Sequence, residues 1–451
     1  MNTKLKIGYM PLAKGNWVTP WVESKREEGL RAVKNLRSDY AIVGGDKLVT
    51  TDAEALALLD QFAAAKVDTI ICHFITFSLG TIVPLIAGRA KLPLVLWSMP
   101  EPPMTGGMLQ SNSFCAVNMN AHALWKMKSP FLHVHAPIET AAPELQKVLG
   151  PVSAATRLRR TKVGLVGGRA PGFYTSCVNE LLLRREFNVE VEHVTLYELV
   201  DAAGKMPAEK VEAALKLLKA GAVCDSTLKE EELRKGAALI AAFVDVKQNL
   251  GIDAFSIKCW AEFIRTYGIY VCAILGTLND NKILAACEGD VYGLVTMIAQ
   301  NELCGELPFF CDLISIDGEG NTGVHWHCGA SPRALANPAC EPCLTKYFGR
   351  GAEIGLTNQF PLKPGRVTVA CLSETRDSNG FRMFITTGEA LETGRILNGN
   401  PLRVRFDAPL NHIAKTLVYQ GFHHHFSLVH GEAKEELLNF CRLLNIEPVV
   451  V

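Results

Sequence analysis

The stretch DTIICHFITFSLGTIVPLIAGRAKLPLVLWSM, residues 68–99, sets the pattern that decides the fold. It begins and ends with short apolar runs, and a longer segment with helical spacing lies between them. Within it, residues 69–88 carry no charge and are long enough to span a bilayer. We interpret them instead as a buried strand followed by a helix, because the run contains polar and turn-forming residues, namely His73, Ser78, Gly80, Thr81 and Pro84.

The same alternation of apolar runs and helical patterns continues on both sides of this stretch. Toward the N-terminus and just beyond it, it predicts strands and helices at residues 6–12, 20–36, 40–45, 52–67 and 131–136. The pattern restarts at residue 162, with further elements expected at 189–196, 229–251 and 254–259. Apolar strands separated by helices are typical of parallel sheets covered on both faces. We therefore predict two doubly wound parallel α/β domains.

The last hundred residues have a different texture, in which short strands alternate with turn signals. They predict antiparallel strands and a final helix at residues 366–373, 382–389, 402–406, 426–430 and 432–444. The expected class is α/β, with a third, antiparallel β-rich and barrel-like domain at the C-terminus. The predicted domain boundaries are 1–158, 159–348 and 349–451.

The composition excludes several function classes. Of the 451 residues, 48% are hydrophobic and 20% are charged, a balance typical of folded globular proteins. Lys plus Arg and Asp plus Glu both number 46, so no overall positive field exists to gather nucleic acid or an anionic membrane surface. The N-terminal residues run directly into a predicted strand, and we expect no export signal. We interpret the 14 cysteines as free thiols of a cytoplasmic protein.

A glycine-rich turn, GGRAPG at residues 167–172, follows the strand that restarts the pattern. Such a turn could hold a phosphate at a helix N-terminus. Its spacing differs from G-x-G-x-x-G, and a tight turn without a ligand is the simpler interpretation. A nicotinamide cofactor therefore has little support.

A group of imidazoles and thiols between residues 325 and 343 indicates a possible soft-metal site. The candidate ligands are His325, His327, Cys328, Cys340 and Cys343. Cys340 and Cys343 form a C-x-x-C pair, but the second such pair of a common zinc site is missing. A structural zinc is thus the rival interpretation of this segment.

Acidic residues stand where apolar strands place ligand-binding groups. Glu288 and Asp290 follow the short apolar run 285–287, just before a predicted helix. By themselves they could be a loop acid and a helix N-cap. Asp312, however, lies inside an apolar strand, and a buried carboxylate is usually paired, hydrogen-bonded or metal-bound. We expect Glu288 to reach Asp312 if their strands lie side by side.

Three consecutive histidines enter the last predicted strand. Because side chains alternate between the faces of a strand, His423 and His425 should point together and His424 should point the opposite way. One face would supply a metal ligand, and the other would make hydrogen bonds that support it.

Three segments resemble the L-fucose isomerase and L-arabinose isomerase superfamily. They are CEGDVYGLVTMIAQ at 287–300, FFCDLISID at 309–317 and GFHHHFSLVHG at 421–431. The resemblance implies that Glu288, Asp312 and His425 bind Mn²⁺ or another divalent ion such as Mg²⁺ or Co²⁺, with His327 as a fourth contact. It also implies a homo-oligomer, a hexamer or trimer. The third histidine leaves open the choice between His424 and His425, and the first 150 residues match the family only in rhythm.

The predicted function is metal-dependent aldose–ketose isomerisation of a sugar through an enediolate, with Glu288 and Asp312 exchanging the protons. We expect the substrate to contact Asp290, His424, Lys258 and Trp260. The sugar is either neutral or anionic, as in a sulfonated or phosphorylated hexose. Candidate contacts to an anion are Arg169, Lys258 and Arg376, although most such charges lie at the surface. The alternatives are a non-catalytic sugar-binding or regulatory module and another lyase or epimerase.

Overall fold

The computed structural model describes residues 5–260, 262–349 and 352–451. The chain separates into two compact units. One comprises Met1–Thr156 with Leu438–Asn445, and the other comprises Arg157–Leu437 with Ile446–Val451. The division into three domains predicted from the sequence stays a prediction.

The first unit contains a five-stranded parallel sheet in the order β2-β1-β3-β4-β5. Its strands are β1 (Lys6–Leu12), β2 (Ala41–Val43), β3 (Thr69–Phe74), β4 (Leu94–Ser98) and β5 (Phe131–His135). Its helices are α1 (Pro20–Lys34), α2 (Asp52–Ala65), α3 (Ile82–Ala90), α4 (Ser113–Lys126) and α5 (Ala141–Arg159). The uncharged run at 69–88 is therefore a buried strand leading into a helix, as predicted.

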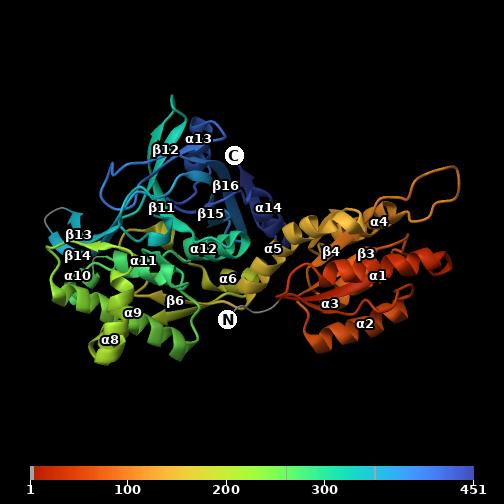
Figure 1. Cartoon of the computed structure of the whole chain (residues 1–451), viewed down its shortest axis with the longest axis horizontal. Helices are drawn as coiled ribbons and strands as arrows, with labels where there is room; N and C mark the ends of the chain where they lie inside the picture. The colour runs from red at the N-terminus through yellow and green to blue at the C-terminus, as the bar shows by residue number, and fades with distance from the viewer. Residues whose placement is uncertain (1–4, 261, 350–351) are drawn as a thin grey trace. The chain divides into compact units, whose positions relative to one another are not determined.

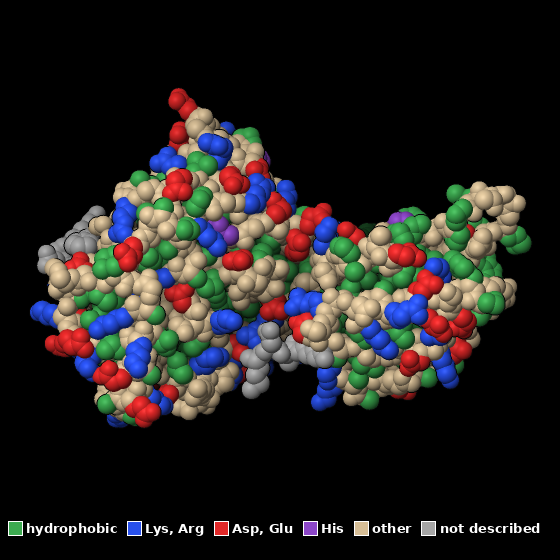
Figure 2. Space-filling view, viewed as in Figure 1, with side chains coloured by type: hydrophobic (Ala, Val, Ile, Leu, Met, Phe, Trp, Pro, Cys, Tyr) green, Lys and Arg blue, Asp and Glu red, His purple; other side chains and the backbone are tan. Residues whose placement is uncertain are grey.

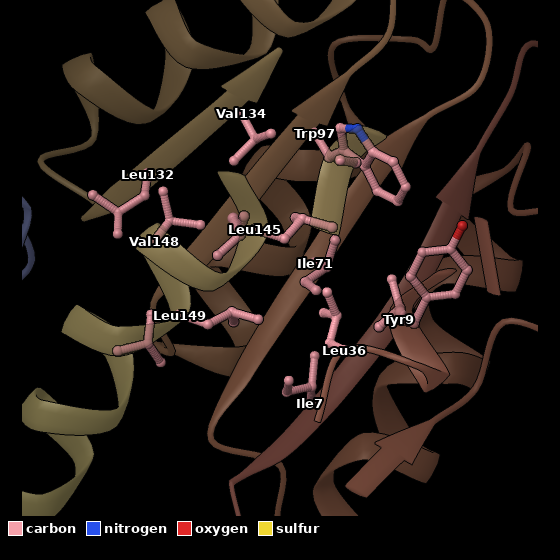
Figure 3. Packing of buried hydrophobic residues seen from close by; sticks show 14 of the residues in the cluster. Ile7, Tyr9, Leu36, Ile71, Trp97, Leu132, Val134, Leu145, Val148 and Leu149 are labelled. Atoms are coloured by element: carbon pink, nitrogen blue, oxygen red, sulfur yellow. The ribbon is translucent and has the colours of Figure 1, made fainter. Parts of the chain in front are cut away.

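Helices cover both faces of this sheet (Figure 1), so alternate residues of each strand are buried in two clusters on opposite sides. On one face, Ile7, Tyr9 and Trp97 pack with Leu145 and Val148 of α5, as Figure 3 shows. The opposite face packs against α2, α3 and α4. Burial on both faces explains why these strands are apolar throughout.

The second unit contains a four-stranded parallel sheet in the order β10-β9-β6-β7. Its strands are β6 (Lys162–Val166), β7 (Glu190–Val194), β9 (Ala254–Ile257) and β10 (Ala285–Cys287). The helices of this region are α6 (Glu180–Phe187), α7 (Leu196–Gly204), α8 (Ala208–Lys219), α9 (Glu230–Leu250), α10 (Glu262–Thr266), α11 (Cys272–Asp280) and α12 (Val291–Cys304).

Antiparallel strands of the same unit close into a barrel, as the sequence predicts. The order is β15-β18-β11-β12-β17-β16, and a further pairing of β15 with β16 closes the ring. The strands are β11 (Phe309–Asp317), β12 (Thr322–Trp326), β15 (Gly365–Glu374), β16 (Phe381–Ala390), β17 (Leu402–Phe406) and β18 (His425–His430). Helix α12 contacts β9 and β10 of the parallel sheet and β15 and β18 of the barrel, so it joins the two layers.

Several elements were not predicted from the sequence. They are the strands β8 (Val223–Cys224), β13 (Cys343–Gly349), β14 (Ala352–Gln359) and β19 (Glu447–Val450), and the helix α13 (Leu410–Tyr419). Strands β8, β13 and β14 form a separate small sheet, and β19 adds to the barrel beside β16. The last helix, α14 (Lys434–Leu443), matches the predicted one.

The surface agrees with the balanced charge of the sequence. Figure 2 shows Lys and Arg interspersed with Asp and Glu over the face in view, without a large area of one sign. Among the described residues, no helix combines the length and apolar character needed to cross a bilayer.

Candidate active site

The carboxyl ends of three neighbouring parallel strands carry candidate residues. Strand β6 leads into the glycine-rich turn with Arg169, β9 is followed by Lys258, and β10 is followed by Glu288. Because the ends of parallel strands meet at one edge of a sheet, these residues come from one edge. This edge is where open α/β sheets bind their ligands.

A tight turn after β10 aims Glu288 at the site. Both Glu288 (φ 63°) and Gly289 (φ 71°) adopt the left-handed conformation. A Cβ at Gly289 would lie only 2.2 Å from the carbonyl oxygen of Gly168, so a larger residue does not fit here. The glycine-rich turn after β6 therefore packs directly against the turn that carries Glu288.

Asp290 begins helix α12 and lies wholly inside the protein. Its Oδ1 accepts a hydrogen bond of 2.8 Å from the backbone N–H of Gly293, which makes it the N-cap. Its Oδ2 lies 2.9 Å from Nδ1 of His425. Asp290 is 0% exposed, and both of its oxygens have partners. It therefore positions the start of α12 and the ring of His425 from within the protein.

His425 and Asp312 are placed by the barrel. Strands β11 and β18 pair antiparallel, and Asp312 stands directly opposite His425. Nε2 of His425 lies 2.9 Å from Oε2 of Glu288 and 3.8 Å from Oδ1 of Asp312. That oxygen of Asp312 is buried and has no hydrogen-bond partner among the described residues. Three carboxylates from two layers of the unit thus surround one imidazole.

The charges of this cluster shift one another's pKa values. Burial opposes charge on Asp290, but its hydrogen bond with His425 and the nearby imidazoles bring the pKa down to about 2. Burial likewise opposes ionisation of Glu288, yet His425 holds its pKa below the usual range. Burial raises the pKa of Asp312 despite the attraction of His327 and His425. Burial disfavours the charged form of His425, but Asp290 and Glu288 raise its pKa to about 9.

His327 follows β12 and is buried beside the same carboxylates. Its Nδ1 lies 3.3 Å from Sγ of Cys328. Burial opposes its charge, but the charges of Cys328, Asp312 and Glu288 raise its pKa to about 10. Hydrogen bonds from Cys272 and Cys287 are the main reason why the pKa of Cys328 falls well below the usual range.

The prediction that His424 points away from His425 is wrong, because β18 begins only at His425 and the centroid of the His424 ring lies 4.0 Å from that of the His425 ring. His423 and His425 are buried, whereas His424 is exposed. Nε2 of His423 lies 2.6 Å from the carbonyl oxygen of Leu372, and its Nδ1 lies 3.9 Å from Oδ2 of Asp290. His424 can join Glu288 and His425 in a possible ion-binding group, so the structure keeps both His424 and His425 at the site.

An aromatic wall borders the exposed side of the cluster. The ring of Phe173 meets the rings of Trp260 and His424 edge-on, at centroid distances of 5.5 and 5.3 Å. Oγ1 of Thr175 lies 3.3 Å from Nδ1 of His424. Trp260 and His424 were predicted as substrate contacts, whereas Phe173 and Thr175 were not. The only sequence signal for the latter pair is their position just after the glycine-rich turn.

Two of the three basic candidates lie at the edge of the sheet. Nζ of Lys258 makes a 2.5 Å salt bridge to Glu262, and its side chain is 13% exposed. The guanidinium of Arg169 lies 5.1 Å above the ring of Tyr174. Arg376 lies in an exposed turn between β15 and β16.

The structure does not meet the condition under which Glu288 was expected to reach Asp312, and it does not support the rival interpretation of the segment 325–343 as one zinc site. Strands β10 and β11 do not lie side by side, because β10 belongs to the parallel sheet and β11 to the barrel. Glu288 approaches Asp312 through the turn at the start of α12 instead. Among the described residues, neither Cys340 nor Cys343 joins a histidine in a metal-binding group, and His325 contacts Cys311. The spacing between residues 325 and 343 therefore does not form one zinc site.

Comparisons with known proteins cover the full length of the chain. It is 29% identical over 449 residues to a protein named sulfoquinovose isomerase from Priestia aryabhattai, covering 98% of both chains. Proteins of the same name from Alkalicoccus urumqiensis and Clostridium sp. (strain MSTE9) are 28% and 27% identical, each covering 99% of both chains. No family model matches the chain.

The comparison with solved structures gives no support for a fold or a function. A periplasmic solute binding protein from Actinobacillus succinogenes with bound D-allose covers 62% of this chain and 83% of its own, at 14% identity and a TM-score of 0.18, too low to carry an argument. The full-length relatives are decisive, and they show that the chain is an enzyme, an aldose–ketose isomerase.

Proposed function

We propose that the chain is a divalent-metal-dependent isomerase of an anionic, sulfonated aldose, of which sulfoquinovose is the leading candidate. The observation that carries the metal dependence is the convergence of Glu288 Oε2, Asp312 Oδ1 and His425 Nε2, with the Asp312 oxygen buried and unpartnered. The printed name of the full-length relatives supports the sulfonated substrate. The same chemistry is implied by the resemblance to L-fucose and L-arabinose isomerases.

The donor set fits a hard divalent ion. Two carboxylates and one imidazole favour Mn²⁺ or Mg²⁺ over a thiolate-seeking metal. His425 is a better third ligand than His424, because it is buried and its Nε2 faces both acids. Asp290 holds Nδ1 of His425, in the arrangement that commonly orients metal-binding histidines. His327 lies beside the same acids and is the fourth candidate.

The chain's own carboxylates supply the proton chemistry. Moving hydrogen between C1 and C2 needs one group that removes a proton and another that returns one. Glu288 enters the site from the parallel sheet and Asp312 from the barrel, so the two carboxylates approach from different layers. A divalent ion held between them would stabilise the negative charge that develops on two neighbouring sugar oxygens.

The substrate's charge and its sugar ring have separate partners. Lys258 follows β9, next to β10 and its Glu288, and we assign it to the sulfonate, with Arg169 as the second cation. Phe173, Trp260 and His424 offer an aromatic surface on which a sugar face can pack. The homo-oligomer implied by the resemblance stays a prediction.

Removal and return of the metal tests the proposed function. The protein is stripped with a chelator, loaded with Mn²⁺, and incubated in D₂O with sulfoquinovose, glucose 6-phosphate, L-fucose and L-arabinose. We expect ketose formation from the sulfonated sugar with the loaded protein only, and solvent deuterium at the reacting carbon. Equal turnover by the stripped protein would contradict metal dependence, and preference for a neutral sugar would contradict the anionic substrate.

Replacement of the acid–base pair should abolish turnover. Because a positioned acid or base contributes about 10²–10⁴-fold, Glu288→Gln and Asp312→Asn should each lose at least that factor in kcat. The matched control is Asp317→Asn, at the exposed end of the same strand as Asp312, which should keep its activity. Thermal unfolding checks that each variant is folded. Full activity in either site variant would remove that residue from the mechanism.

Asp290→Asn should weaken metal binding without unfolding α12. Asn caps a helix as well as Asp does, so the melting temperature should change little. An amide NH₂ facing Nδ1 of His425 would leave the ring proton on Nε2, which then cannot face a cation. We expect a ~10–100-fold loss in Mn²⁺ affinity, measured by calorimetry. Unchanged affinity with unchanged stability would show that Asp290 does not orient His425.

Lys258→Met should discriminate against the charged substrate. A charge-assisted hydrogen bond contributes roughly 1.5–3 kcal/mol, so kcat/KM for sulfoquinovose should fall about 10–150-fold, mainly through KM. Lys205→Met, at the exposed residue that follows α7, serves as the control. Any slow turnover of glucose should fall far less. An equal loss for both sugars would mean that Lys258 supports the fold of the site rather than recognising the sulfonate.

A further inference from the structure

Four cysteine side chains meet next to the carboxylate cluster, although they are far apart in the sequence. Cys259 follows β9, Cys272 begins α11, Cys287 ends β10, and Cys328 follows β12. The first three are 4%, 2% and 1% exposed, and Cys328 is partly buried. Four separate segments of the second unit therefore direct a thiol to one place.

The distances are those of a cluster rather than of ordinary core packing. Sγ of Cys272 lies 3.3 Å from Sγ of Cys328. Cys287 makes thiol contacts to both Cys259 and Cys328. The ligand atoms of Cys287, His327 and Cys328 lie within 4.8 Å of one another. In a tetrahedral Zn²⁺ site with metal–sulfur distances of ~2.3 Å, neighbouring sulfurs are about 3.8 Å apart, so the sulfurs of Cys272 and Cys328 are already close enough, and Cys259 and Cys272 would have to move toward Cys287 to complete the site.

We propose that Cys259, Cys272, Cys287 and Cys328 form a thiolate site for a soft metal, with Zn²⁺ as its occupant, separate from the ion held by the carboxylates. Four thiolates are a common ligand set of structural zinc. His327 places Nδ1 3.3 Å from Cys328 and supports that sulfur by a hydrogen bond. Its other ring nitrogen, Nε2, would remain free to bind the ion held by Glu288 and Asp312.

The position of the cysteines gives the site a structural consequence. Three of them are the chain neighbours of functional residues, since Cys259 follows Lys258, Cys287 precedes Glu288 and Cys328 follows His327. A metal that joins the four thiolates would fix the ends of β9 and β10 relative to α11 and to the end of β12. The cluster would thus hold the residues that contact substrate and the first ion.

Metal content of the untagged, full-length protein tests the proposal. Cells are grown with added Zn²⁺ and Mn²⁺, and the protein is dialysed against EDTA before elemental analysis. We expect about one Zn²⁺ per chain to remain while Mn²⁺ is lost. Protein produced with Co²⁺ in place of Zn²⁺ should show the intense visible absorption and the near-ultraviolet thiolate bands of tetrahedral Co²⁺.

Variants separate this site from the carboxylate site and from chance binding. Cys272→Ser and Cys328→Ser should lose the retained Zn²⁺, whereas Cys340→Ser and Cys343→Ser should keep it. Glu288→Gln should keep Zn²⁺ while losing Mn²⁺, so failure of one site is distinguishable from failure of the other. If the cysteine variants do not fold, the Co²⁺ spectrum of the wild type decides. Wild-type protein with no retained Zn²⁺, and with either four free thiols or a Cys272–Cys328 disulfide by mass spectrometry, would overturn the proposal.

Discussion

The paired charges around His425 are the interaction on which the second unit depends. Asp290 is fully buried, and an ionised carboxylate in that position is stable only when its oxygens are satisfied. One oxygen caps α12, and the other meets an imidazole carried by the barrel. The same imidazole meets Glu288, which follows the parallel sheet. A single side chain therefore links the end of the sheet, the start of a helix and a barrel strand.

The elements that the sequence predicts are those whose own residues carry a clear pattern. Strands β3 and β4 are buried on both faces, so they are apolar throughout and are recognised easily. Strands β15 and β17 alternate or are bounded by turn residues, and they too were predicted. Strand β8 has two residues, and it exists only because β13 pairs with it, so no local pattern marks it.

The residues of the candidate site also differ in whether a local sequence pattern predicts them. Asp312 was predicted because an acid in an apolar strand is costly, and His425 was predicted because its segment resembles the histidine motif of the L-fucose and L-arabinose isomerase superfamily. Phe173 and Thr175 reach His424 across the fold, and only their position just after the glycine-rich turn distinguishes them in the sequence. Asp290 was expected both as an N-cap and as a substrate contact; the structure shows the cap and places its second oxygen against His425.

The cysteines show why nearness in sequence is a poor guide to a metal site. Cys340 and Cys343 have ligand-like spacing but do not join a histidine in a metal-binding group within the described chain. Cys259, Cys272, Cys287 and Cys328 have no such spacing and lie together, because the ends of β9 and β10 are neighbours in the sheet. The topology of the sheet, which the local sequence pattern does not encode, would decide the ligand set of the proposed thiolate site.

The two proposed ligand sets differ in character and come from the same strand ends. Cys287 ends β10 and lies beside Cys328, whereas the left-handed turn that follows directs Glu288 toward His425. Thiolates favour Zn²⁺ and carboxylates favour Mn²⁺ or Mg²⁺, so the two proposed sets would select different metals by ligand chemistry rather than by affinity alone. A tightly held soft ion would then keep the backbone in place while the harder ion exchanges. Such an arrangement would let the proposed acid–base carboxylates stay accessible to substrate and would keep the rigidity that proton transfer between fixed positions requires.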